Sequence, residues 1–242
     1  MSEKVDISLV GPGIHPEYWM EIYDKLSKEN EASFEMIFIG FNRPSFELPP
    51  NFKYYYSEVK MPQCLEAGMR LANGEYVLAT GDDFIHCEGF LDKLLCHASK
   101  NDMDKTIIIP RAARRWKAKV RSLYHRKNKK YPIVGLAGLM KKDVYMSLGG
   151  IDKRFIAVAW HEDLHLRFYE RGGSPVVAND CIWNEEDRGS YLTESYSDID
   201  NDLLISLWSD SNKNFVATRS DELQPFESQD ILKITQGSKG KW

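Results

Sequence analysis

One stretch of the chain decides how the rest is interpreted, and it reads Ala72-Asn73-Gly74-Glu75-Tyr76-Val77-Leu78-Ala79-Thr80-Gly81-Asp82-Asp83. Its apolar run, residues 76–79, has the length and the residue types of a buried strand. Asp82 and Asp83 follow this run directly, and open α/β sheets bind their ligands at the carboxyl ends of their strands. Two hard oxygen donors at such a place suit Mg²⁺ or Mn²⁺. Because Gly-Asp-Asp is also a common turn sequence, the rest of the chain must decide between a metal site and a turn.

Composition and length indicate an ordinary globular protein. The chain has 242 residues, of which 43% are hydrophobic and 28% are charged, enough for one large domain or two small ones. No apolar run reaches the roughly 20 residues that span a bilayer, and the polar start shows no signal peptide, so we expect a cytoplasmic protein without a transmembrane segment. The four cysteines are Cys64, Cys87, Cys96 and Cys181, and no two of them have Cys-x-x-Cys spacing. We therefore expect isolated thiols and not a disulfide frame or a zinc site.

The charge pattern argues against a nucleic-acid-binding protein. Net charge is −4, although the segment from Lys105 to Lys130 is strongly basic. That segment has three interpretations: a solvated loop, a contact to an anionic ligand such as a diphosphate, a phosphorylated lipid or an acidic glycan, or a nucleic-acid surface in which Trp116, Tyr124 and Tyr131 stack on bases. The acidic net charge makes the third the weakest, and we expect no nucleic-acid partner.

Strands and helices alternate over the first 110 residues. The periodicity predicts strands at 5–10, 34–39, 52–56, 75–80 and 106–109, with helices beginning at Pro16 and spanning 62–71 and 89–99. This order predicts an α/β fold with a mostly parallel central sheet flanked by helices. Further elements are expected at 133–140, 142–148, 162–171, 176–177 and 182–183. The pattern weakens after residue 190, so we expect one domain over 1–190 and a C-terminal extension over 191–242, helical at 202–208 and frayed at its end.

Three motifs occur in order along this framework. Residues 66–77 end in Ala72-Asn73-Gly74-Glu75-Tyr76-Val77, residues 149–155 read Gly149-Gly150-Ile151-Asp152-Lys153-Arg154-Phe155, and residues 162–166 read Glu162-Asp163-Leu164-His165-Leu166. The set resembles the GT-A fold glycosyltransferases, family 2 in particular, whose motifs are Ala-x-Gly-Glu-Tyr, Gly-Gly-Phe-Asp-x-x-Phe and Glu-Asp-x-Asp-Leu. Thr80 stands where the family's Asp-x-Asp-Asp motif has its first Asp, and the second strand ends in Gly40-Phe41-Asn42 where the family has an Asp pair.

The resemblance implies a metal-dependent transfer with inversion, from a nucleotide-diphosphate sugar to a glycan, lipid-linked or other hydroxyl acceptor, as in polysaccharide biosynthesis. It implies Asp82 and Asp83 as ligands of Mn²⁺ or Mg²⁺, Asp163 as general base, and Glu162 as an acceptor contact or a support for Asp163. Trp160 and His161 would line the acceptor site, and a lipid-linked acceptor allows peripheral membrane contact. The donor contacts that the resemblance implies are Pro12, Gly13, Gly40, Asn42, Gly68, Thr80 and Asp82.

Two other functions remain open at this point. Residues 161–165 read His-Glu-Asp-Leu-His, which also matches the His-Glu-x-x-His string of zinc proteases, although its position among the three motifs favours the transferase. Carboxylates in the first turn of a helix are also favoured by the helix dipole alone. A non-catalytic nucleotide- or glycan-binding protein on the same scaffold is the main alternative.

Overall fold

The computed structural model describes residues 4–114, 138–185, 191–212, 214–229 and 231. Its central sheet has the strand order β3-β2-β1-β4-β7, and every neighbouring pair is parallel except β4 and β7. The strands are β1 (Ile7–Pro12), β2 (Phe34–Gly40), β3 (Phe52–Tyr56), β4 (Tyr76–Ala79) and β7 (Met140–Lys141). The mostly parallel α/β sheet expected from the sequence is thus confirmed.

A second, smaller sheet has the order β5-β8-β6. It contains β5 (Phe84–His86), β6 (Thr106–Arg114) and β8 (Ser174–Glu185), with β8 parallel to β6 and antiparallel to β5. The two short strands predicted at 176–177 and 182–183 are one strand, interrupted by a bulge. Ala178 pairs with Pro110 and Ile182 with Arg111, so residues 179–181 have no partner in β6.

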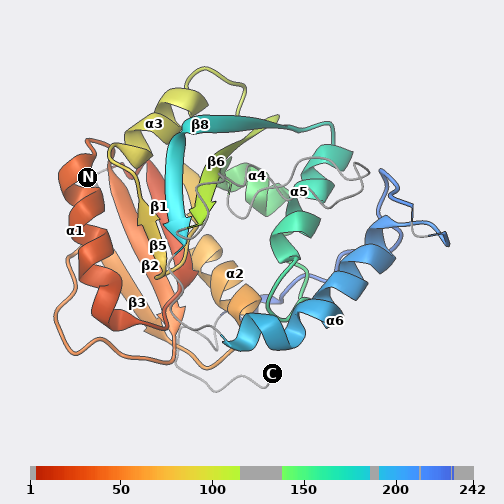
Figure 1. Cartoon of the computed structure of the whole chain (residues 1–242), viewed down its shortest axis with the longest axis horizontal. Helices are drawn as coiled ribbons and strands as arrows, with labels where there is room; N and C mark the ends of the chain where they lie inside the picture. Colours follow the sequence, from red (N-terminus) through yellow and green to blue (C-terminus); the bar gives the residue numbers. More distant parts are fainter. Residues whose placement is uncertain (1–3, 115–137, 186–190, 213, 230, 232–242) are drawn as a thin grey trace.

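Helices cover both faces of the central sheet (Figure 1). The helices of the fold are η1 (Pro16–Tyr18), α1 (Trp19–Glu29), α2 (Met61–Leu71), α3 (Phe90–Ala98), α4 (Lys142–Ser147), α5 (Trp160–Glu170) and α6 (Tyr191–Trp208). Alternate strand residues point to opposite faces. Val10 therefore packs in one core with residues of α2, α5 and α6, while Leu9 packs in a second core with residues of α1 and α3.

The segment after residue 190 packs against the rest of the fold. Helix α6 is longer than the expected 202–208, and its Leu204 and Trp208 belong to the same core as Leu164 of α5. The chain then returns to α2, where the Arg70 guanidinium donates to the Phe226 carbonyl (2.7 Å). Among the described residues, no helix combines the length and the apolar character needed to cross a membrane. Most of the basic segment predicted at 105–130 lies outside the described residues.

Candidate functional site

Asp82 lies just beyond the carboxyl end of β4 and is buried. Its Oδ2 atom accepts hydrogen bonds from the backbone N–H groups of Ile14 (2.6 Å) and His15 and from the indole Nε1 of Trp19 (3.2 Å). A carboxylate makes short, strong hydrogen bonds of this kind because its acceptor oxygen is charged. Asp82 therefore holds the loop between β1 and η1 against the carboxyl edge of the sheet.

Glycines allow β1 and β2 to approach this loop closely. A Cβ atom at Gly40 would overlap the carbonyl oxygen of Gly13, and one at Gly13 would lie 2.8 Å from the Trp19 ring. Asn42 donates from Nδ2 to the Ile14 carbonyl (2.6 Å). The loop begins at Pro12, the last residue of β1. The structure thus gathers Pro12, Gly13, Gly40, Asn42 and Asp82 at one edge.

The two remaining residues of the predicted donor site are Thr80 and Gly68. Thr80 is buried and extends the pairing of β4, because its N–H donates to the Val10 carbonyl (2.8 Å). Gly68 lies within α2, where a side chain would overlap Val10 of β1. Gly68 thus allows α2 to pack closely on the sheet, away from the loop that Asp82 holds.

The carboxylates at the end of β4 have the donor chemistry that Mg²⁺ and Mn²⁺ prefer. Asp83 is half-buried, and its side chain folds back over Gly81, where a Cβ atom would overlap Oδ1. A cation here would be held by carboxylate oxygens of Asp83 and Asp82, and Oδ2 of Asp82 also accepts three N–H groups. The two residues therefore fit a divalent cation.

The second acidic motif lies in the first turn of α5. Ala159, which precedes the helix, has a φ of 60°, a conformation that costs a non-glycine residue about 1–2 kcal/mol. Asp163 has no exposed surface. Its Oδ2 atom accepts from Nε of Arg167 (2.9 Å), while Oδ1 accepts from Nε1 of Trp208 (3.0 Å) and Nε of Arg219 (3.0 Å). Glu162 is also largely buried, with 6% of its surface exposed.

The C-terminal segment supplies much of the support for this motif. The fully buried carboxylate of Asp200, in α6, accepts hydrogen bonds from the backbone N–H groups of residues 156, 157 and 158, just before α5. Arg219 bonds Asp163 and also donates to Oδ2 of Asp152 (2.5 Å). These contacts were not predicted, because single polar residues beyond position 190 follow no periodic pattern.

Asp152, from the Gly-Gly motif, is a second buried carboxylate in this network. Burial raises its pKa, but hydrogen bonds from Arg154 and Arg219 outweigh burial and lower the pKa to about 2. The preceding Gly150 has a φ of 75° and lies so close to Glu66 that a Cβ atom would overlap its carboxylate. The Gly-Gly motif thus provides a left-handed turn that packs on α2.

His161 and His165 line a small cavity of about 20 Å³ between α5 and Ala79 of β4. Burial lowers the pKa of His161 to about 4 and that of His165 to about 3, so both are neutral at pH 7. Within the described residues, the group of His, Cys, Asp or Glu side chains that could hold a metal ion is His97, Asp180 and Cys181, which includes neither histidine of α5. The zinc-protease interpretation gains no support from this geometry. Trp160 and His161 are mostly buried, so little ring surface is open to an acceptor.

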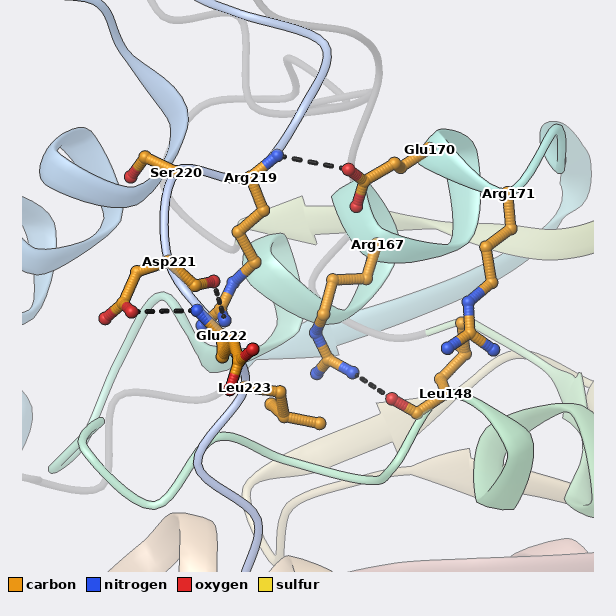
Figure 2. A pocket seen from close by; sticks show the side chains of 9 residues that line it. All are labelled: Leu148, Arg167, Glu170, Arg171, Arg219, Ser220, Asp221, Glu222 and Leu223. Atoms are coloured by element: carbon orange, nitrogen blue, oxygen red, sulfur yellow. Dashed lines mark hydrogen bonds between the residues drawn. The ribbon is translucent and has the colours of Figure 1, made fainter.

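A polar pocket of about 450 Å³ lies beside α5 (Figure 2). Its lining residues are Leu148, Arg167, Glu170, Arg171, Arg219, Ser220, Asp221, Glu222 and Leu223. Three arginines face three acidic residues there, and the Arg167 guanidinium is already bonded to the Leu148 carbonyl (2.6 Å). No residue from the carboxyl ends of β1, β2 or β4 lines it. Balanced charge and this location make it a poor match for a diphosphate.

Comparison with solved structures supports the fold. The chain is similar to the crystal structure of S. aureus TarS, a neighbour of glycosyltransferase fold, with a TM-score of 0.57 and 12% sequence identity. The match covers 75% of this chain and 36% of TarS, so the chain spans little more than a third of that protein. No protein-family model and no curated protein matches the sequence. The likeness therefore shows a distant glycosyltransferase fold.

Proposed function

We propose that this protein transfers a sugar from a nucleotide-diphosphate donor to a hydroxyl group of a glycan or lipid-linked acceptor. The observation that carries the proposal is the convergence of Gly13, Gly40, Asn42 and Asp82 on one loop at the carboxyl edge of the sheet. Ligands of open α/β folds bind at this edge. The glycosyltransferase fold of the chain supports the same reaction class.

In this proposal the nucleotide lies against the loop between β1 and η1, with Asn42 near the base and Thr80 near the ribose. Asp82 fixes the loop, and Asp83 is the main ligand of Mn²⁺ or Mg²⁺. A divalent cation bound here would neutralise charge that develops on the leaving diphosphate.

We propose that Glu162 and Asp163 remain the catalytic pair, with their roles exchanged relative to the family resemblance. Both oxygens of Asp163 accept hydrogen bonds from buried donors, which leaves it the role of fixing the first turn of α5. Glu162 then takes the proton of the acceptor hydroxyl. The acceptor oxygen bonds to the anomeric carbon as that carbon releases the diphosphate oxygen, so the configuration inverts.

Two matched variants test this assignment. Glu162→Gln is expected to lower kcat about 10²–10⁴-fold, because it removes the proton acceptor, and to lower the unfolding midpoint less than Asp163→Asn does. Asp163→Asn is expected to lower the unfolding midpoint as well as the rate. Sugar transfer and thermal unfolding are measured on the same preparations. If Asp163→Asn were fully stable but inactive while Glu162→Gln stayed active, the general base would be Asp163 and not Glu162.

The engagement of Asp163 also favours a second candidate function, a non-catalytic nucleotide- or glycan-binding protein on the same scaffold. Such a protein needs Asp163 only as a structural anion. Calorimetry with nucleotide sugars separates the two: the transferase binds its donor more tightly with Mn²⁺ and consumes it, whereas the binding protein shows neither metal dependence nor turnover.

A further inference from the structure

We propose that His97, Asp180 and Cys181 form a zinc site between the end of α3 and β8, separate from the carboxylates at the end of β4. The ligand atoms of the three side chains lie within 4.8 Å of one another. Nε2 of His97 is 2.6 Å from Oδ1 of Asp180, and Sγ of Cys181 is 3.9 Å from the same oxygen.

The bulge in β8 explains how two consecutive residues serve one site. In a regular strand, neighbouring side chains point to opposite faces of the sheet. Residues 179–181 are unpaired with β6, because Ala178 pairs with Pro110 and Ile182 with Arg111. The extra residues re-aim the chain, so that Asp180 and Cys181 both reach toward α3. His97, in the last turn of α3, meets them there.

The ligand types select zinc. Imidazole nitrogen, thiolate sulfur and carboxylate oxygen are its usual protein ligands, whereas Mg²⁺ and Mn²⁺ prefer oxygen alone. Bonds of about 2.0–2.3 Å in a tetrahedron place ligand atoms about 3.3–3.8 Å apart. The observed separations of 2.6 and 3.9 Å lie on either side of that range, so small side-chain rotations complete the site.

Solvent can reach the site, and the charges balance. The side chains of His97 and Asp180 are 25% and 59% exposed, which leaves room for water as the fourth ligand. A neutral imidazole, a carboxylate and a thiolate together carry the two negative charges that neutralise Zn²⁺. A cysteine thiol without metal is ordinarily protonated at neutral pH. Zinc binding therefore forms the Zn–S bond and releases the thiol proton to solvent.

Two neighbouring thiols are left out of the ligand set. Sγ of Cys87 accepts the Ile182 N–H (3.3 Å) and lies 3.8 Å from Nζ of Lys93. Cys96 precedes His97 on α3, is exposed, and bonds Lys100. Without zinc, His97 and Asp180 would simply form an ordinary surface ion pair.

The test is calorimetric titration of Zn²⁺ into the chelator-treated full chain, in buffers of different ionisation enthalpy. We expect one zinc per chain at this site, about one proton released, and a rise in the unfolding midpoint with Zn²⁺ that requires His97 and Asp180. Cobalt substitution should give a thiolate-to-metal charge-transfer band that Cys181→Ser removes.

Variants of the two solvent-accessible ligands, His97 and Asp180, test the site even if replacement of the buried Cys181 causes misfolding. His97→Gln and Asp180→Asn should each weaken zinc binding at least about tenfold, while Cys96→Ser, with its exposed thiol next to His97, should bind as the wild type does. Absence of zinc binding, or equal binding by His97→Gln and Cys96→Ser, would overturn the proposal. The outcome is independent of sugar transfer, which uses the carboxylates at the end of β4.

Discussion

Asp82 and Asp163 are both buried carboxylates from acidic motifs of the sequence, yet the molecule holds them in different ways. Oδ2 of Asp82 accepts from three neutral donors, two backbone N–H groups and an indole, all from residues 14–19. Asp163 accepts two guanidinium groups and an indole, and two of these donors come from residues 208 and 219. The edge of the sheet is thus organised by one nearby loop, whereas the start of α5 depends on the C-terminal segment.

The largest expected effect comes from breaking the charged network. Asp163→Asn removes the buried carboxylate that pairs with Arg167 and leaves Arg219 with Asp152 as its remaining anion, which costs about 3–5 kcal/mol of unfolding free energy. Chemical denaturation measures the change. The control is Asp24→Asn, which removes an exposed partner of Lys28 and should change stability little. A loss in Asp163→Asn no larger than in this control would break the comparison.

Replacing Asp82, which accepts from neutral donors, should lower the unfolding free energy less than replacing Asp163. Asp82→Asn keeps the shape but weakens charge-assisted hydrogen bonds to the loop, so we expect a loss of about 1–2 kcal/mol. Because the loop is then less fixed, donor affinity should fall more than stability does. Denaturation and nucleotide titration on one preparation measure both, and unchanged donor affinity would separate the loop from the donor site.

The loss of unfolding free energy at low pH tests the charged network through Asp152. Asp152 has a pKa of about 2 in the fold and 3.8 as its ordinary value, so its contribution is present above pH 4. As the pH falls from 4 to 2 the unfolded state binds the proton first, and about 2 kcal/mol is lost. Asp152→Asn should remove this part of the acid dependence. The measurement is the unfolding free energy of the wild type and of Asp152→Asn between pH 2 and pH 5. An equal dependence on pH in the two proteins would contradict the network.

The sequence predicted one region better than the other. The apolar run at 76–79 marked a strand end, and strand ends of a parallel sheet share an edge, so the position of Asp82 followed from local pattern. The contacts of Asp163 with Trp208 and Arg219 could not be predicted, because these residues are distant in sequence and approach Asp163 only through the packing of the C-terminal segment. The bulge in β8 could not be predicted either: the sequence indicates two short strands at 176–177 and 182–183, and the spacing of the cysteines does not show that Cys181 lies near His97.

The most direct test of the central claim is a thermal-shift screen of nucleoside diphosphates with and without Mn²⁺. At 100 times its dissociation constant, a ligand of the native state adds about 2.7 kcal/mol of stability. We expect at least one diphosphate to raise the unfolding midpoint only with Mn²⁺, and Asp83→Asn to lose this shift while Asp24→Asn keeps it. No shift with any diphosphate, or an equal shift in Asp83→Asn, would contradict a metal–diphosphate site at the end of β4.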